Sequence, residues 1–145
     1  MNTKLKGDIA EQTAVVEALS RAWGVSRPIG DNLPYDLIFD ISGRLVKIQV
    51  KCAWLDRSSG NFVADNRRTK TNRRAMVRSQ YQDSDFDFAL VYLSECRLFY
   101  IFPVQVFIAY GSEIHMVEGK KRQRKPRSWV YRDAWYLLEQ WAEEK

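Results

Sequence analysis

Three polar side chains gather in residues 34–51, PYDLIFDISGRLVKIQVK, and their chemical types suit the binding of a hard metal cation. Asp36 supplies a carboxylate, Gln49 an amide and Lys51 an ammonium group. Carboxylate and amide oxygens that lie close together can share a cation such as Mg²⁺ or Ca²⁺. The same residue types are common on the exposed face of a half-buried hairpin, so the three residues alone leave a purely structural role open.

The element that would position these residues is a β-hairpin. Two strand-like runs, residues 35–41 and 44–52, flank Ser42 and Gly43, and the glycine tolerates the positive φ of a tight turn. If Ile41 faces Arg44 across this turn, Asp36 lies directly opposite Gln49. Directly opposed residues have Cβ atoms about 4.5–5.5 Å apart, so this register predicts contact between the two side chains.

Period-two alternation gives the second strand of the hairpin two different faces. One face is apolar and is expected to join the core: Val46, Ile48, Val50 and Cys52. The other face carries the polar side chains: Lys47, Gln49 and Lys51.

The net charge of +5 is distributed unevenly along the chain. Residues 67–78 hold six basic residues and no acid, and residues 120–132 hold seven, again with no acid. Thirteen of the 23 basic residues lie in these two runs, which leaves 10 basic against 18 acidic residues elsewhere. Such segregation predicts a polyanionic partner, because each Lys or Arg on a phosphate releases counterions. Nucleic acid is favoured over a membrane, since neither run forms an amphipathic helix with a broad apolar face.

Length and composition favour one domain over residues 1–145. A chain of this length buries about two-thirds of its unfolded surface without a disulfide framework. Cys52 and Cys96 lie in apolar runs without metal-ligand spacing, so we expect small core residues in a reducing cytoplasm. The N-terminus lacks the apolar region of a signal peptide, and no run approaches the ~20 apolar residues of a membrane span. His115 is the single histidine and cannot build a His-ligated zinc site, so a structural role is expected.

An amphipathic helix is predicted over residues 4–23, and Gly24 is expected to end it. Its apolar positions recur at spacings near the helical period: Ile9, Ala10, Val16, Ala18, Leu19, Ala22 and Trp23. Glu11 lies at the flank of this stripe, where it either reaches the edge of the sheet or remains a solvated carboxylate.

The remaining elements complete an α/β pattern. Residues 86–93 and 98–102 are nearly all apolar and predict two strands at the sheet centre, with helices on both faces. Residues 61–64 and 111–118 predict short extended pieces, 54–60 a polar connection, and 104–110 either a short helix or irregular chain. The first basic run fits helix and strand equally well. From Ser128 onward, helical periodicity predicts a second helix packed on the sheet.

Glu11, Asp36, Gln49 and Lys51 follow one another in the order of the PD-(D/E)xK nuclease signature, with PYD and QVK as its two pieces. Further stretches carry the same likeness: GDIAEQ, DNLPYDLIFD to KIQVK, NRRTKTNRR, DFDFAL, FYIFPVQVFIAYGSEIH and KRQRKPRS. Together they closely resemble the cyanobacterial group I intron-encoded homing endonucleases of PD-(D/E)xK type, over nearly the whole chain. Gln49 departs from the wider superfamily, where an acid is usual, and looks like the glutamine of this intron-encoded branch.

The resemblance implies a restriction-endonuclease-like α/β core, in which a mixed β-sheet is flanked by helices. It also implies Mg²⁺-dependent hydrolysis of phosphodiester bonds in both strands of a long DNA site, by a homotetramer that serves intron homing. Ca²⁺ is expected to support DNA binding without cleavage, and neither a small-molecule cofactor nor a membrane is expected. Such a protein would act in the cytoplasm, at the bacterial nucleoid.

Catalytic roles are implied for Glu11, Asp36, Gln49 and Lys51. Asp36, the Gln49 carbonyl oxygen, Glu11 and the scissile phosphate could complete the octahedral oxygen shell that Mg²⁺ prefers. Because glutamine is neutral, metal binding without DNA is expected to be weak. Lys51 could orient or deprotonate the attacking water or stabilise developing charge, and either one or two metal ions would fit.

DNA contacts are expected from both basic runs, and most of them should be to phosphates. The residues are Asn66, Arg67, Arg68, Lys70, Asn72, Arg73, Arg74, Arg78, Lys120, Lys121, Arg122, Gln123, Arg124, Lys125 and Arg127. The candidates for contacts with base edges are Asn66, Arg67, Arg68, Asn72, Gln123 and Arg124.

Two other functions are compatible with the sequence. A junction-resolving or repair nuclease of the same fold would select DNA by shape rather than by sequence. A catalytically silent DNA-binding protein is the alternative outside enzymes, and Gln49 in place of the usual acid is the best argument for it.

Overall fold

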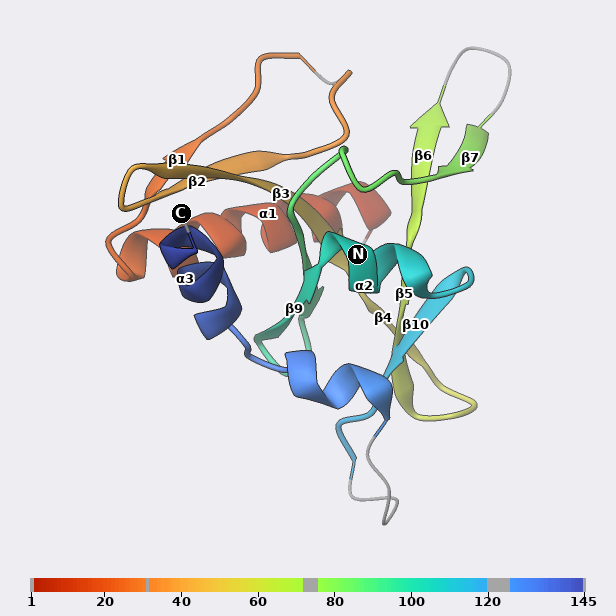
Figure 1. The fold of residues 1–145 in the computed structure, drawn as a ribbon. Coiled ribbons are helices and arrows are strands. Elements are labelled where there is room, and N and C mark those ends of the chain that lie inside the picture. The colour runs from red at the N-terminus through yellow and green to blue at the C-terminus, as the bar shows by residue number, and fades with distance from the viewer. Residues whose placement is uncertain (1, 31, 72–75, 120–125, 145) are drawn as a thin grey trace.

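The computed structural model describes residues 2–30, 32–71, 76–119 and 126–144 (Figure 1). The helices in this part of the chain are α1 (Thr3–Ser20), α2 (Val104–Ala109), the 3₁₀ helix η1 (Arg127–Tyr131) and α3 (Tyr136–Glu143). The strands are β1 (Gly24–Ser26), β2 (Leu37–Ile41), β3 (Arg44–Cys52), β4 (Trp54–Asp56), β5 (Asn61–Asp65), β6 (Arg67–Thr71), β7 (Met76–Gln80), β8 (Phe88–Leu93), β9 (Leu98–Pro103) and β10 (Glu113–Met116).

The largest sheet has five strands in the order β1-β2-β3-β8-β9. β3 and β8 are parallel and the other neighbours are antiparallel, so the sheet is mixed. A three-stranded sheet, β10-β5-β4, and a two-stranded pair, β6-β7, complete the β structure of the described residues. The predicted α/β class, with a mixed sheet flanked by helices, is confirmed.

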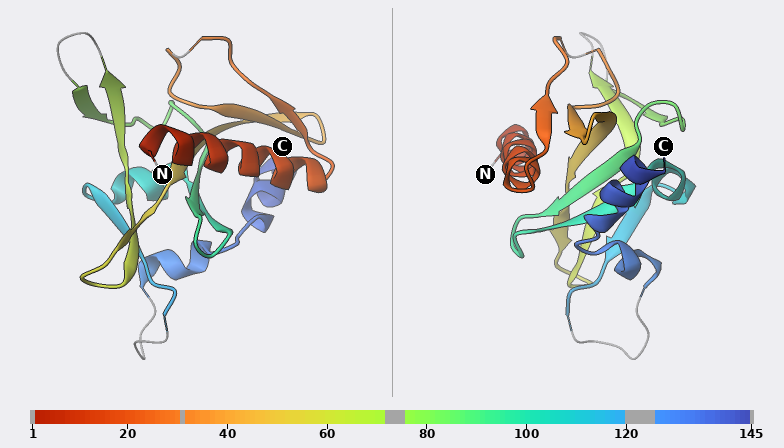
Figure 2. Two further views of the ribbon diagram at one scale, coloured as in Figure 1. Left: turned by 180° about the vertical axis from the view of Figure 1, so that it is seen from behind. Right: turned by 60° about the vertical axis from the view of Figure 1, so that its left-hand side comes forward.

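Apolar clusters cover both faces of the five-stranded sheet. On one face, Phe39 and Ile48 pack with residues of α1 and α3, such as Ala14 and Leu138. On the opposite face, Phe102 packs against α2, β5 and β10. Figure 2 shows α1 lying along one side of the sheet. Burial on both faces explains why all six residues of β8 are buried.

The prediction that both strands around residues 86–93 and 98–102 form the sheet centre is wrong for the second strand. β8 is interior, but β9 is an edge strand. Its edge is covered by chain that follows η1, because Tyr100 forms an antiparallel bridge with Arg132 and the Asp133 N–H donates to the Phe99 carbonyl. This cover allows an edge strand to remain apolar.

The predicted apolar stripe of the first helix is partly wrong. The buried residues of α1 are Ala10, Ala14 and Ala18, whereas Val16 and Leu19 are 63% and 58% exposed. Alanines spaced by four residues share one face of a helix, and their small side chains let α1 lie close to β3. The larger apolar residues therefore lie on a different face, and periodicity alone did not distinguish the two.

Both predicted helices have different bounds in the structure, and in each case a residue with positive φ lies where the helix is interrupted. α1 ends at Ser20, and the left-handed residue is Ala22, at φ 62°, rather than Gly24, which begins β1. The helix expected from Ser128 is divided into η1 and α3 by Asp133, at φ 52°. Its predicted packing on the sheet is confirmed, because Ala134, Trp135 and Leu138 belong to the core.

Shorter elements agree with the sequence in part. The expected extended pieces at 61–64 and 111–118 contain β5 and β10, and the segment 104–110, for which helix and irregular chain were both open, contains the short helix α2. The described residues of the first basic run lie in β6 and β7, while β1 and β4 were not predicted. Both cysteines are free; Cys52 is half-buried, but Cys96 is exposed in a turn, so its predicted place in the core is wrong. None of the described helices is long and apolar enough to span a membrane.

The hairpin of β2 and β3 has the predicted register. Ile41 pairs with Arg44, and Leu37 pairs with Ile48. Ser42 and Gly43 have φ values of 53° and 89°, which is the pattern of a type I′ turn, and the Gly43 N–H donates to the Asp40 carboxylate at 2.8 Å.

Gly43→Ala should lower the free energy of unfolding by about 1–2 kcal/mol, because an L-residue is strained at this φ. An added Cβ meets no atom within 4 Å, so the cost would be conformational rather than steric. Urea denaturation measures the effect, and Gly111→Ala is the matched control, since its Cβ also meets open space and its φ is not positive. Equal stability changes in the two variants would contradict the assigned strain.

Candidate active site

The Asp36 carboxylate lies against two groups of β3. Its Oδ2 atom accepts hydrogen bonds from Gln49 Nε2 at 2.9 Å and from the Val50 N–H at 2.8 Å. The Asp36 N–H donates to the Ile48 carbonyl at 2.8 Å, which continues the ladder of the hairpin by one residue. The predicted contact between Asp36 and Gln49 is therefore present.

The carboxylate of Asp36 is held in an environment that disfavours its charge. Burial raises the pKa of Asp36, while the Val50 hydrogen bond and the positive charge of Lys51 act in the opposite direction. Gln49 beside it is only 8% exposed. A cation bound beside Asp36 would therefore stabilise the charged form of its carboxylate.

Lys51 extends from β3 on the same face as Gln49. Its Nζ atom donates to the Arg67 carbonyl at 2.9 Å and lies 5.2 Å from the centre of the Tyr81 ring. Its charge lowers the pKa of Asp36, so the ammonium group and the carboxylate are electrostatically coupled.

Glu11 reaches the same place from α1. Burial raises the pKa of Glu11, and the negative charge of Asp36 raises it further, so the two carboxylates interact. Arg27, in the loop after β1, lowers the pKa and forms an ion pair with Glu11 at 3.6 Å. Asp36 thus contacts Gln49 and is electrostatically coupled to Lys51 and to Glu11, whose side chain is half-buried at 29% exposure.

Comparison with known proteins identifies the family of the chain. The model of the PD-(D/E)XK endonuclease family matches residues 1–138. The chain belongs to this family. Among solved structures, the bacterial homing endonuclease I-Ssp6803I matches with 59% sequence identity and a TM-score of 0.93, over 100% of this chain and 98% of that chain. A comparison with curated proteins gives no match. The predicted restriction-endonuclease-like fold and DNA endonuclease activity are confirmed.

The donor set of the endonuclease fits a hard divalent metal ion. Asp36 and Glu11 supply carboxylate oxygens and Gln49 an amide oxygen, which are the ligands that such ions prefer. Within the described residues, no group of three or more His, Cys, Asp or Glu side chains could hold a metal. Gln49 currently turns its Nε2 atom toward Asp36, and a half-turn of the amide would present the oxygen instead.

Among the predicted DNA contacts, Asn66 needs correction. Its side chain is 4% exposed, and its Nδ2 atom donates to the carbonyls of Phe107 and Tyr110 at 3.1 and 2.7 Å. Asn66 therefore ties β5 to α2 and is not available to read a base edge. Its sequence neighbours are all polar, so nothing in the pattern marks it as buried.

Three other predicted DNA contacts can be located. The Arg67 guanidinium donates two hydrogen bonds to the Asp65 carboxylate, at 3.0 and 3.1 Å, and Arg68 donates to the Asn32 carbonyl at 3.0 Å. Arg127 lies over the Tyr110 ring, 4.6 Å from its centre. The side chains of the remaining predicted contacts lie outside the described residues: Lys70, Asn72, Arg73, Arg74, Arg78, Lys120, Lys121, Arg122, Gln123, Arg124 and Lys125.

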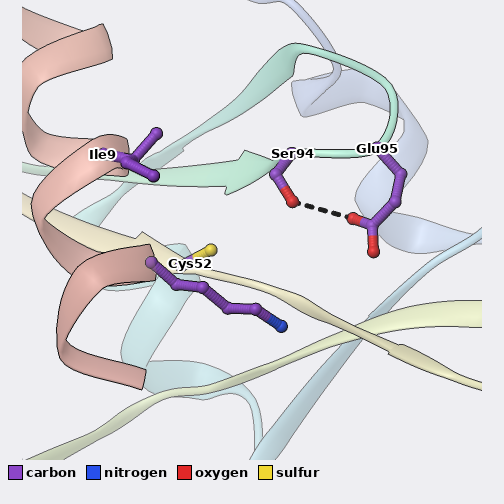
Figure 3. Close-up of a pocket in the computed structure, with 5 residues that line it drawn as sticks. Ile9, Cys52, Ser94 and Glu95 are labelled. Atoms are coloured by element: carbon purple, nitrogen blue, oxygen red, sulfur yellow. Dashed lines mark hydrogen bonds between the residues drawn. The ribbon is translucent and has the colours of Figure 1, made fainter. Parts of the chain in front are cut away.

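A pocket of about 260 Å³ lies on the α1 side of the sheet (Figure 3). It is lined by Lys6, Ile9, Cys52, Ser94 and Glu95. The Ser94 hydroxyl donates to the Glu95 carboxylate at 2.9 Å, and burial raises the pKa of the Cys52 thiol. None of the four active-site residues lines this pocket, so it is separate from the candidate active site.

Sequence analysis missed Arg27 and Tyr81, which contact Glu11 and Lys51. Arg27 lies outside the predicted helices and strands, and Tyr81 stands between two glutamines. Both contacts arise from the packing of distant segments, and no local spacing signals them.

Asp36→Asn should stabilise the folded endonuclease at neutral pH. Because burial raises the pKa of Asp36, the folded chain binds this proton more tightly than the unfolded chain does. Stability is therefore lost as pH rises from the unfolded pKa through the folded pKa, and the loss persists above that range. Both hydrogen bonds are accepted by one oxygen, so the asparagine oxygen can keep them.

Thermal unfolding at several pH values measures this effect. The variant should melt above the wild type at pH 7, and the difference should vanish below about pH 3.9, the ordinary pKa of aspartic acid. Asp83→Asn, at an exposed residue, is the control and should change little. A variant that melts below the wild type at pH 7 would contradict the raised pKa.

Proposed function

We propose that this endonuclease is a homing enzyme that hydrolyses both strands of a long, specific DNA site with Mg²⁺ as its metal. The observation that carries the proposal is the convergence of Glu11, Asp36, Gln49 and Lys51 at the root of the β6–β7 hairpin. The 59% identity to a bacterial homing endonuclease supports the homing function. The family match over residues 1–138 supports the expectation of one domain, and a DNA substrate supports action at the nucleoid.

Hydrolysis of a phosphodiester needs an activated water, stabilisation of extra negative charge on the phosphate and departure of a sugar oxygen. A bound Mg²⁺ would polarise the phosphate and lower the pKa of water. Asp36 and Glu11 would hold the ion by carboxylate oxygens, and Gln49 by its amide oxygen. Lys51, fixed beside Asp36, would orient the water or stabilise charge on the phosphate oxygens.

The neutral amide of Gln49 makes metal binding depend on DNA. With glutamine in place of an acid, only two carboxylates attract the cation. Arg27 already neutralises part of the charge of Glu11. The phosphate of the substrate would supply the missing negative charge, so the metal and the DNA should bind cooperatively.

The DNA would lie across the end of the sheet where β6–β7 and the loop before β2 extend beyond the other elements (Figure 1). Arg68, from β6, joins the two by its hydrogen bond to the Asn32 carbonyl. Arg67 and Arg68, with Asn72, Gln123 and Arg124, remain the proposed base readers. The other basic residues of the two runs would hold phosphates.

Lys51→Ala should lower the cleavage rate by about 100-fold or more while the variant still binds DNA, because the ammonium group acts on the reacting phosphate or water. Linearisation of a plasmid that carries the target, with Mg²⁺, measures cleavage. Gel shift with Ca²⁺, which should support binding without cleavage, measures affinity.

Lys47→Ala is the matched control, since Lys47 points to the same face of β3 and its Nζ atom donates to the Ser84 carbonyl. It should cut at nearly the wild-type rate. If the wild type binds DNA but never cuts it with any divalent metal, the enzymatic proposal fails. Cleavage-site selection from a DNA library separates a homing enzyme, which recovers one long site, from a junction-resolving or repair nuclease, which recovers none.

The proposed homotetramer is supported by the face of α1 that the sheet does not cover. Leu5, Ile9, Val16 and Leu19 are exposed and share this face, where a groove of about 550 Å³ runs along the helix. Their spacings of four, seven and three residues suit packing against another helix. A second copy of the chain would bury this apolar surface.

Val16→Glu should weaken self-association, because a charge would then be buried between the copies. Sedimentation velocity at several protein concentrations measures the oligomeric state. Leu45→Glu is the control, since Leu45 is similarly exposed on β3, away from α1. A wild-type protein that sediments as a monomer would rule out the homotetramer, and an unchanged Val16→Glu variant would rule out this face.

A further inference from the structure

Tyr81 is buried directly beside the active site. It follows the last residue of β7, is 6% exposed, and packs edge-on against Phe86, with ring centres 5.1 Å apart and planes at 82°. A second ring, that of Phe107, lies 6.2 Å away. The orientation of the Tyr81 ring is therefore fixed by its neighbours.

The ring lies close to the Lys51 ammonium group. The Nζ atom is 5.2 Å from the ring centre, within the range in which an aromatic face attracts a cation. The same atom donates to the Arg67 carbonyl at 2.9 Å. A lysine side chain has four flexible carbon–carbon bonds, so these two contacts restrict a group that would otherwise sample many positions.

Both contacts come from the root of the same hairpin. Arg67 begins β6 and pairs with Gln80, the last residue of β7, and Tyr81 comes next. The first residue of β6 thus supplies a backbone carbonyl, and the residue after β7 supplies an aromatic ring. These two groups together hold Lys51.

The surroundings of Tyr81 favour the neutral form of its hydroxyl. Burial raises the pKa of Tyr81, and the negative charges of Asp36, Asp85 and Asp65 act in the same direction. Arg68 acts in the opposite direction. A neutral phenol retains the electron-rich ring face that attracts an ammonium group.

We infer that Tyr81 is a positioning residue for Lys51: its ring face and the Arg67 carbonyl hold the ammonium group where the reaction needs it, and so join the DNA-binding hairpin to the catalytic lysine. This inference rests on the proposed catalytic role of Lys51. It assigns the function to the aromatic ring, so phenylalanine should replace tyrosine and leucine should not.

Tyr81→Leu should lower kcat by about tenfold, the rate effect of a contact of this strength, with KM changed by less than about twofold. Tyr81→Phe should cut at nearly the wild-type rate. The substrate in these assays is the DNA duplex that cleavage-site selection identifies as the target of the wild-type enzyme. Tyr92→Leu is the matched control, because Tyr92 is equally buried, at 7% exposure, on the opposite face of the sheet.

NMR of the full chain, with selectively labelled lysine, gives a readout that a general loss of stability would not move. The Lys51 ε-methylene protons lie near the Tyr81 ring, so their signals should be shifted by its ring current in the wild type and in Tyr81→Phe. The shift should be lost in Tyr81→Leu and kept in Tyr92→Leu. The wild-type spectrum tests the contact even if a variant fails to fold.

The outcomes separate this inference from the proposed function. If Lys51→Ala cuts at the wild-type rate, the catalytic role of Lys51 fails, and the inference fails with it. If Lys51→Ala is inactive but Tyr81→Leu cuts normally, or if Tyr81→Phe is as slow as Tyr81→Leu, the inference alone is overturned. An unshifted Lys51 methylene signal in the wild type would also overturn it.

Discussion

The candidate active site depends on one carboxylate oxygen, Asp36 Oδ2, which accepts hydrogen bonds from Gln49 and from the Val50 backbone. Together with the turn at Gly43, these bonds define the register of β2 on β3 from the two ends of the hairpin. A slip of one residue would turn every β3 side chain to the other face and would move Lys51 into the core beneath α1. The active site and the core therefore require the same register.

β3 lies at the centre of the sheet, where both of its faces are covered. This position withdraws Asp36 and Gln49 from water, which raises the pKa of the carboxylate and costs stability in the absence of a cation. The same withdrawal strengthens each electrostatic interaction at the site. Stability and the proposed catalytic role are therefore opposed at Asp36, as is common at functional sites.

The sequence was most informative where local patterns determine structure. The alternation of apolar and polar residues, the glycine in the turn and the pairing of Ile41 with Arg44 were enough to place Asp36 opposite Gln49. It was least informative where distant segments choose between similar faces. α1 packs through Ala14 rather than through its larger apolar residues, β9 is an edge strand because chain near Arg132 covers it, and Asn66 is buried although its neighbours are polar. No local pattern encodes these choices, because each depends on which surface happens to be opposite.

Two of the proposed catalytic side chains, Glu11 and Lys51, are contacted by the two segments nearest the proposed DNA. Glu11 is paired with Arg27, at the start of the loop before β2, and Lys51 is held at the root of β6–β7. The two segments are joined by the hydrogen bond from Arg68 to the Asn32 carbonyl. Movement of either segment would thus change the surroundings of a proposed catalytic charge, whereas Asp36 and Gln49 are held by the hairpin of the sheet. This division separates a rigid half of the site, which would hold the metal, from a half whose geometry would respond to the bound DNA.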